Sequence, residues 1–261
     1  MSPARRFEIQ HRQECLCHAG SDACATPVDP GLPKTLFWDV IILLFGPPGC
    51  GKGTQAALLA EKLQIPAIST GEMFRAECKA GTELGKRACS ILNSGGLVGD
   101  DIVNAMVANR IAQADCAQGF LLDGYPRTVP QAMNFSALLG RRGLPDPIVI
   151  HLDVAEPALV ARLTARRQCP QCLHIYNLLS QPPRTPDRCD NDGAVLTTRA
   201  DDQEAVIRDR LRAYRELTGP ILKWYGKSAV RDVDGAGSPD QVARATEQAV
   251  REAAALEGAR R

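Results

Sequence analysis

A glycine-rich loop that contains a lysine is the first candidate for chemistry in this sequence. Residues 46–54 read Gly-Pro-Pro-Gly-Cys-Gly-Lys-Gly-Thr, between an apolar run at 40–45 and a helix-forming stretch at 54–63. Glycines allow backbone N–H groups to turn inward around a polyphosphate, and a helix start adds the positive end of its dipole. Lys52 adds a compact positive charge for the β- and γ-phosphates of a nucleotide. A plain strand-to-helix turn is the alternative, but the complete set in this setting favours a phosphate-binding loop.

The loop departs from the general motif at one position that concerns magnesium. Ser or Thr normally follows the lysine directly, whereas Gly53 precedes Thr54 here. A direct bond from Thr54 to magnesium therefore does not follow from the motif. Asp123 is a second candidate, because it ends a buried apolar stretch, where a carboxylate commonly holds magnesium directly or through water.

Arginines are the candidates for binding further phosphates, since a guanidinium group binds two phosphate oxygens at once. Arg75 and Arg127 each follow a short apolar stretch closely. Ligands of parallel sheets bind at such strand exits, so we expect both to be functional rather than simply solvated. For Arg166, Arg199 and Arg210 the residues alone do not decide between these two interpretations.

Three cysteines and an aspartate have the spacing of a metal site. Cys169 and Cys172 form a C-x2-C pair, and Cys189 and Asp192 follow sixteen residues later as C-x2-D. Two such knuckles predict a structural Zn²⁺ held by three thiolates and one carboxylate. The alternative is that the thiols are free and Asp192 is a loop residue. Four protein ligands leave no open position for catalysis, so the zinc would be structural.

The elements that position these residues alternate between strand-like and helical patterns. The run at 40–45 is continuously apolar, which indicates a strand buried on both faces. Strand signals recur at 66–68, 119–122, 148–154 and 229–233, and helical stretches occupy 101–114, 131–139 and 202–225. This order predicts an α/β fold with a mainly parallel sheet covered on both faces. Residues 169–197 are rich in Pro, Cys and Asp, which indicates a small inserted domain.

Composition limits the class of protein. The chain has 261 residues, 31 of them basic and 30 acidic, and 44% are hydrophobic. This predicts one sizeable core with insertions, and it gives no whole-chain signal for a nucleic acid or membrane partner. The longest apolar run is far too short to span a bilayer. The first 30 residues lack the apolar segment of a signal peptide.

The remaining cysteines and the N-terminal region allow weaker predictions. Residues 1–36 are expected to form a disordered or loosely attached extension. Its Cys and His residues form only a weak metal pattern, and a flexible tail with free thiols is the preferred interpretation; they are Cys15, Cys17, Cys24, His11 and His18. We expect four scattered cysteines to be small buried hydrophobes in a reducing compartment, namely Cys50, Cys78, Cys89 and Cys116. No disulfide framework is required, so a cytoplasmic location is expected.

Several motifs together resemble one enzyme family. Gly-Lys-Gly-Thr at 51–54 resembles the nucleoside monophosphate kinases. Ser-Thr-Gly-Glu-Met-Phe-Arg at 69–75 follows one strand, and Asp-Gly-Tyr-Pro-Arg at 123–127 follows another, with Gln131 four residues later. Thr-Thr-Arg-Ala-Asp-Asp at 197–202 precedes Arg210, and Val-Asp-Gly-Ala-Gly at 233–237 follows the last strand. In this order and spacing, the motifs resemble the long-lid bacterial adenylate kinases from about residue 40 to about residue 250.

The resemblance implies a fold and a reaction. It implies a P-loop NTPase fold, three layers deep around a five-stranded parallel sheet, with core segments 37–68, 99–164 and 203–256. It places an AMP-binding insertion at 69–98 and a zinc-ribbon-like lid at 165–202. The implied reaction is reversible transfer from Mg²⁺-bound ATP to AMP, giving two ADP without a phosphoenzyme. The implied protein is a monomer whose partners are ATP, AMP and ADP.

The resemblance also assigns site residues on the donor side. ATP-binding positions would be Gly49, Cys50, Gly51, Lys52, Gly53, Thr54, Arg162, Arg166, Ile175, Tyr176 and Gly237. Arg162 would lie along the adenine, and Asp123 would hold magnesium through water. The lid hairpin of the family usually reads Gly-Arg-x-Tyr-His after its first knuckle, and residues 173–177 of this chain keep only the tyrosine.

On the acceptor side, AMP-binding positions would be Thr70, Arg75, Gly96, Leu97, Val98, Gly124, Tyr125, Pro126, Arg127, Gln131, Arg199 and Arg210. Thr70 and Gln131 would face the base, and pyrimidine-accepting relatives usually have alanine in place of Thr70. Catalytic roles would fall to Lys52, Arg127, Arg166, Arg199 and Arg210. Asp201 and Asp202 would orient the arginines, or cap the following helix.

Two alternatives stay open at this point. One is a kinase for UMP, CMP or GMP. The other is a nucleotide-dependent RNA-binding protein whose zinc ribbon contacts RNA, which predicts a basic and aromatic ribbon. Residues 169–192 contain two arginines, three aspartates and one tyrosine, which does not favour RNA.

Overall fold

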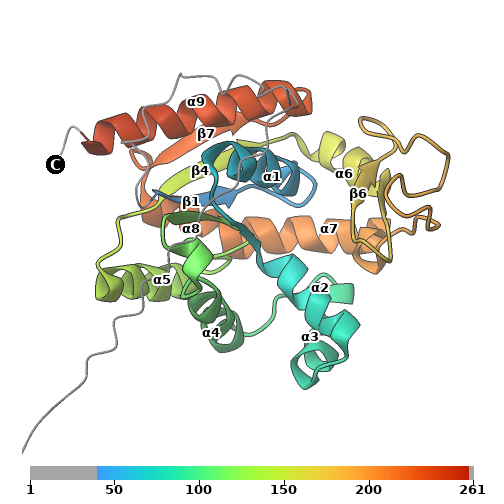
Figure 1. Cartoon of the computed structure of the whole chain (residues 1–261), viewed down its shortest axis with the longest axis horizontal. Coiled ribbons are helices and arrows are strands. Elements are labelled where there is room, and N and C mark those ends of the chain that lie inside the picture. The colour runs from blue at the N-terminus through green and yellow to red at the C-terminus, as the bar shows by residue number, and fades with distance from the viewer. Residues whose placement is uncertain (1–39, 259–261) are drawn as a thin grey trace, which may run out of the picture. The chain divides into compact units, whose positions relative to one another are not determined.

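The computed structural model describes residues 40–258, which form one core around a parallel sheet. The prediction for residues 1–36 lies outside the described residues. Five parallel strands follow the spatial order β2-β3-β1-β4-β7. Figure 1 labels β1, β4 and β7 of this sheet. Their bounds are β1 Val40–Phe45, β2 Ala67–Ser69, β3 Gly119–Asp123, β4 Ile148–Asp153 and β7 Val230–Asp234. The predicted α/β class and five-stranded parallel sheet are confirmed.

The central strand β1 explains the continuous apolar run. It pairs in parallel with β3 on one side and β4 on the other, and all six of its residues are buried. Successive side chains of a strand point to opposite faces. Ile42 and Leu44 accordingly enter one hydrophobic cluster, and Ile41 and Leu43 enter the other.

Helices cover both faces of the sheet and complete three layers. The cluster on one face takes apolar side chains from α1 (Lys52–Leu63), α6 (Glu156–Thr164), α7 (Glu204–Ala213) and α9 (Pro239–Gly258). The cluster on the other face takes them from α4 (Asp100–Arg110), α5 (Val129–Arg142) and α8 (Gly219–Tyr225). Figure 1 shows α9 and α5 on opposite sides of the sheet.

The single helix expected over 202–225 is divided in the structure. A 3-10 turn covers Ala200–Asp202, α7 follows, and a π-helical turn over Tyr214–Thr218 separates α7 from α8. Gly219 and Pro220 stand at this junction, and proline cannot donate a hydrogen bond to the preceding turn. One helical pattern thus corresponds to four segments in the structure. None of the described helices combines the length and the apolar composition that a membrane span requires.

Two small units extend from the core. Helices α2 (Thr70–Ala80) and α3 (Glu83–Asn93) form a hairpin within the predicted insertion 69–98. Strands β5 (Arg166–Gln168) and β6 (Ile175–Asn177) form an antiparallel pair within the predicted lid. A small cluster of buried residues, Cys169, Tyr176, Cys189 and Leu196, gives this lid a core of its own.

The cysteine prediction was right for two residues and wrong for two. Cys50 and Cys116 are buried free thiols, as expected. Cys78 and Cys89, expected to be free as well, form a disulfide between α2 and α3, with their Cα atoms 5.8 Å apart. Their spacing of eleven residues gives no sign of the bond, because it depends on how tightly the two helices pack.

Candidate active site

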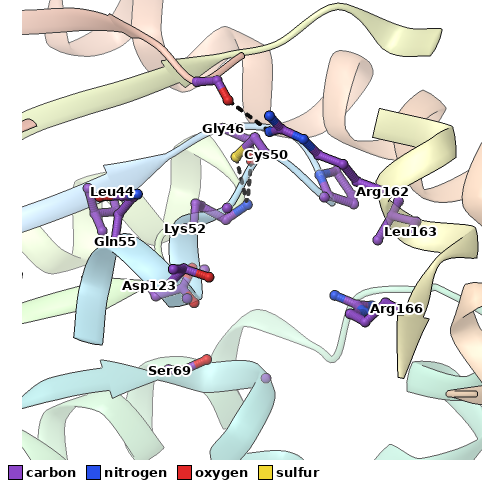
Figure 2. A pocket seen from close by; sticks show the side chains of 18 of the residues that line it. Leu44, Gly46, Cys50, Lys52, Gln55, Ser69, Asp123, Arg162, Leu163 and Arg166 are labelled. Atoms are coloured by element: carbon purple, nitrogen blue, oxygen red, sulfur yellow. Dashed lines mark hydrogen bonds between the residues drawn. The ribbon is translucent and has the colours of Figure 1, made fainter. Parts of the chain in front are cut away.

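The phosphate-binding loop occupies the turn between β1 and α1. Gly46, Gly49 and Gly51 adopt positive φ angles of 149°, 85° and 101°, which only glycine adopts without strain. No side chain among the described residues caps the start of α1 at Gly51. Its first N–H groups are therefore suited to an anion. The Lys52 ammonium donates hydrogen bonds to the carbonyls of Gly46 (2.7 Å) and Pro47 (3.0 Å), and so points back over the loop (Figure 2).

A cavity of about 670 Å³ opens above this loop, which is within the usual range for a small-molecule site. Its walls come from the loop, the residues at and after the carboxyl end of β3, the hairpin, α6, the lid, α7 and the turn after β7. Seven basic side chains from these separate segments line it: Lys52, Arg75, Arg127, Arg162, Arg166, Arg199 and Arg210. The fold thus brings together every arginine that the sequence analysis singled out.

The arginines of this cavity are half-buried, close together and only partly neutralised. Burial lowers the pKa of Arg127 and of Arg199, and neighbouring guanidinium groups lower both further. The same two causes lower the pKa of Arg75 and of Arg210, although Asp201 opposes the effect. Within the described residues, Arg75 Nε and Arg199 Nη2 are buried without a hydrogen-bond partner. Such a cluster is suited to a polyanion that supplies both charge and acceptors.

Two adjacent aspartates fix the arginines on the lid side. Asp202 is fully buried and accepts hydrogen bonds from Arg166 Nε (2.7 Å) and Nη2 (2.5 Å), and from Arg210 Nη1 (3.2 Å). Asp201 forms an ion pair with Arg210 at 3.0 Å. The residue that precedes α7 as its N-cap is Gln203. The aspartates therefore orient arginines, and the alternative role as helix caps is wrong.

Asp123 ends β3 and lies beside the phosphate-binding loop, across from Lys52 (Figure 2). A Cβ atom added at Gly53 would be 3.9 Å from its Oδ2. Thr54 lines the same cavity. Carboxylate and hydroxyl oxygens are the ligands that Mg²⁺ prefers, so these residues fit a Mg²⁺ ion beside the loop.

Arg162 holds the turn after β7 at the far end of the cavity. Its guanidinium donates to the carbonyls of Gly235 (2.8 Å) and Ala236 (3.1 Å), and Gly237 also lines the cavity. The lid contributes Ile175 to the wall, while Tyr176 faces the other way. Successive residues of a strand point to opposite faces. The Tyr176 hydroxyl is buried in the lid, where it accepts a hydrogen bond from the N–H of Asp190 (2.7 Å). The Tyr176 side chain therefore does not line the cavity, and the expected ATP contact at Tyr176 stays a prediction.

A second, smaller cavity adjoins the first on the hairpin side. The two share Gly71, Leu97, Gly124 and Arg127, and the smaller one is also lined by Thr70, Gly96, Val98 and Gln131. Pro126 lines the larger cavity. Tyr125, expected to contact AMP, lines neither cavity: it is buried, and its hydroxyl donates to Asn104 Oδ1 (2.7 Å). The Tyr125 side chain is therefore directed into the core, and the expected contact of Tyr125 with AMP stays a prediction.

Gln131 and Thr70 are both held by neighbouring groups. Gln131 donates from Nε2 to Asp100 Oδ1 (2.7 Å), and its Oε1 accepts the N–H of Arg127 (2.7 Å). An amide has two N–H groups and two lone pairs, so one of each remains. Thr70 donates from Oγ1 to the Gly124 carbonyl (2.9 Å). Sequence reasoning missed Asp100, whose only signal is a carboxylate just after Gly99 at a helix start.

The proposed zinc ligands meet in the lid. One ligand atom from each of Cys169, Cys172, Cys189 and Asp192 lies within 4.8 Å of the others. The N–H groups of Gln171 and Cys172 lie 3.3 and 3.4 Å from Cys169 Sγ, as donors that stabilise a thiolate. A hydrogen bond from the Ala194 N–H, together with the neighbouring thiols, lowers the pKa of Asp192 to about 2, so its carboxylate is ionised. This donor set fits a structural Zn²⁺.

Comparison with known proteins decides the family. The family model described as adenylate kinase matches residues 44–230, which is most of the chain. The chain belongs to the adenylate kinase family. An adenylate kinase of Trichlorobacter lovleyi is 48% identical over 198 residues, covering 76% of this chain and 92% of the relative. Those of Methanococcoides burtonii and Anaeromyxobacter dehalogenans strain 2CP-C are 46% and 44% identical, over 77% and 80% of this chain and 94% and 98% of the relatives.

Membership of the adenylate kinase family accounts for the order of the motifs along the chain. The matched residues include the phosphate-binding loop, all seven basic residues of the large cavity, and the lid. Adenylate kinases use ATP with Mg²⁺, and the lid cluster fits the zinc of the long-lid members. The Cys78–Cys89 disulfide lies in the same matched region.

Proposed function

We propose that the protein catalyses reversible phosphoryl transfer from Mg²⁺-bound ATP to AMP, giving two ADP. The observation that carries this proposal is the shared wall between the two cavities. The phosphate-binding loop stands at one side of the larger cavity, and Arg127 belongs to both cavities. The smaller cavity has a volume of about 20 Å³, so only the edge of the acceptor base would enter it. The acceptor phosphate would meet a donor on the loop among the arginines of the larger cavity.

The chemistry of the step requires alignment and charge neutralisation. The attacking group is a phosphate oxygen, already ionised at pH 7, so no general base and no phosphoenzyme are needed. Lys52 and the loop N–H groups would hold the β- and γ-phosphates. Arg166, Arg199 and Arg210 would surround the transferred group, with fixed positive charge preorganised by Asp201 and Asp202.

Magnesium bound with ATP would neutralise charge on the phosphates, and Asp123 and Thr54 would hold it, with Asp123 acting through water. On the acceptor side, Arg75 and Arg127 would grip the phosphate of AMP. Thr70 and Gln131 would face its base, at the positions that Gly124 and Asp100 fix. Zinc in the lid would keep its fold and take no part in the reaction.

Exclusion of water follows from contact between the two small units. Lys79 of the hairpin donates a hydrogen bond to the carbonyl of Gln171 in the first lid knuckle (2.9 Å). Hairpin and lid would thus close over the cavity from two sides, which would limit hydrolysis of ATP. All of these side chains come from one chain, so a monomer suffices. We further propose a cytoplasmic location, because the zinc thiolates need reducing conditions.

A coupled spectrophotometric assay with ATP and each of AMP, GMP, CMP and UMP tests the proposal. AMP is expected to give the highest kcat/KM by at least about 100-fold, since a base lacking matched hydrogen bonds leaves buried polar groups unpaired. Preference for UMP would reject the role of Thr70. A gel-shift experiment with RNA tests the remaining alternative, and binding at physiological salt would support it.

A further inference from the structure

The disulfide between Cys78 and Cys89 is the feature that neither the motifs nor the proposed reaction explains. It joins the last turn of α2 to the middle of α3, and both residues are partly exposed. Outside the lid, the other two cysteines of the described residues, Cys50 and Cys116, are buried free thiols. Of the described cysteines outside the lid, this pair is therefore the accessible one. Its two sulfurs lie at bonding distance from each other.

The two helices that the disulfide joins build the acceptor cavity with their other ends. Helix α2 begins at Thr70 and carries Arg75 one turn before Cys78. Helix α3 leads directly into the segment of Gly96 and Val98, which line the same cavity as Thr70. A bond that fixes α2 against α3 therefore fixes the two walls of the acceptor cavity relative to each other.

The two helices pack tightly beside the disulfide, so a bond there also limits the movement of α2 relative to α3 along their length. Gly85 of α3 lies so close to the carbonyl of Glu77 on α2 that a Cβ atom there would collide with it. Cys78 follows Glu77 directly, and Cys89 lies one turn after Gly85. Lys79, which follows Cys78 on α2, donates the hydrogen bond to the carbonyl of Gln171 in the lid. The cross-link is thus placed at the point where the hairpin is both closely packed and in contact with the lid.

We propose that Cys78 and Cys89 are a reversible redox modification site that sets the affinity of the enzyme for its acceptor nucleotide. The co-reactant is a small-molecule thiol–disulfide couple. One cysteine thiolate attacks a sulfur of the small disulfide and releases one small thiolate. The second cysteine attacks the mixed disulfide, forms the Cys78–Cys89 bond and releases the other small thiolate. The cysteines are oxidised, the small disulfide is reduced to two thiols, and the two cysteine protons pass to the released thiolates.

The proposal rests on the proposed function and extends it to regulation. A cross-link removes conformations in which α2 and α3 separate, so less ordering remains to be done when AMP binds. Reduction restores those conformations. We expect the KM for AMP to rise about threefold to tenfold on reduction. The affinity for ATP should stay unchanged, because the phosphate-binding loop lies between β1 and α1, away from the disulfide.

The experiment compares the full chain after treatment with glutathione disulfide and after treatment with a phosphine reductant. Peptide mass spectrometry reports the Cys78–Cys89 bond. Hydrogen exchange reports the stability of α2 and α3, and steady-state assays report the KM for AMP and for ATP. The expected result is a bond that forms and breaks reversibly, faster exchange in 70–93 when reduced, and a change confined to AMP.

The controls separate this bond from other thiols. The double variant Cys78→Ser with Cys89→Ser is expected to match the reduced wild type in both treatments, and Cys78→Ala with Cys89→Ala to do the same. Cys116→Ser leaves the pair intact and is expected to keep the full response. A missing bond, an equal KM for AMP in both states, or a response that survives in the double variants would overturn the proposal. Absence of AMP turnover in both states would instead reject the proposed function.

Discussion

The carboxylate of Asp202 accepts two hydrogen bonds from one guanidinium group, 2.7 Å from Nε and 2.5 Å from Nη2 of Arg166. Asp202 is fully buried, and 16% of the Arg166 side chain remains exposed, on the side of the cavity. This geometry fixes the plane of the guanidinium and leaves its remaining N–H donors free toward the cavity.

Asp202→Asn keeps the shape of this residue and removes its charge. We expect kcat to fall about 10- to 100-fold, because Arg166 and Arg210 lose the group that orients them. Loss of one partner from a buried ion pair also lowers the free energy of unfolding by about 3 kcal/mol. Steady-state kinetics and urea denaturation measure the two effects. Asp201→Asn is the matched control. It should lower kcat and the free energy of unfolding less than Asp202→Asn does, since Asp201 is partly exposed. Equal losses of kcat and of stability in the two variants would contradict the role of Asp202.

Lys52→Ala removes the one ammonium group among the basic side chains of the larger cavity. We expect kcat/KM to fall about 100-fold or more, because charge at the β- and γ-phosphates is lost in the transition state. The fold should persist, since Lys52 bonds only to its own loop in the structure, through Gly46, Pro47 and Cys50. Circular dichroism verifies the fold. Lys86→Ala, at an exposed site on α3, is expected to leave activity unchanged. Turnover near that of the wild type in Lys52→Ala would reject the proposed mechanism.

Arg127→Ala tests the residue that both cavities share. Arg127 donates from Nε to the Gly124 carbonyl (2.8 Å), and burial lowers its pKa. We expect the KM for AMP to rise and kcat to fall, with binding of ATP alone changed much less. Calorimetric titration with AMP and, separately, with a non-hydrolysable ATP analogue distinguishes these effects. Arg141→Ala, on the exposed end of α5, serves as the control. A loss shared equally by both nucleotides would argue against an acceptor role.

Thr70→Ala tests the choice of acceptor base. The Thr70 hydroxyl bonds to the Gly124 carbonyl at the wall of the smaller cavity. The substitution removes the hydroxyl and one methyl group. It should lower kcat/KM for AMP about 10-fold relative to UMP, since adenine would lose a polar contact and the packing of that methyl group. Thr70→Ser keeps the hydroxyl and should retain most of the preference. The assay compares AMP and UMP in all three proteins. Unchanged selectivity in Thr70→Ala would remove Thr70 from the specificity argument.

Removal of metal from the lid tests the zinc site. A strong chelator should release one Zn²⁺ per chain, measured by plasma mass spectrometry, and should speed hydrogen exchange in β5 and β6. Asp192→Cys completes a four-cysteine set and should keep the metal, whereas Asp192→Ala should bind it more weakly. Full metal content in Asp192→Ala would show that the carboxylate is not a ligand. If hydrogen exchange in β5 and β6 stayed slow after metal removal, the lid would need no zinc for its fold.

The parts of the site that lie on single continuous motifs were predictable from the sequence. The loop at 46–54, Asp123 at the end of a strand and the C-x2-C and C-x2-D knuckles are local patterns. Their chemistry follows from residue type and spacing, because neighbouring residues on a tight turn must lie close together. The strand of residues 40–45 was predictable in the same way, since a run buried on both faces has to be apolar throughout.

Tertiary structure decided which way side chains face and which distant residues meet. Tyr176 and Ile175 are neighbours in sequence, yet strand geometry turns one into the lid core and the other toward the cavity. The support of Gln131 by Asp100 joins residues 31 positions apart, and the Cys78–Cys89 bond depends on the packing of two helices. Spacing along the chain fixes distances only within one element. Distances between elements depend on packing, which the sequence pattern of either element alone does not contain.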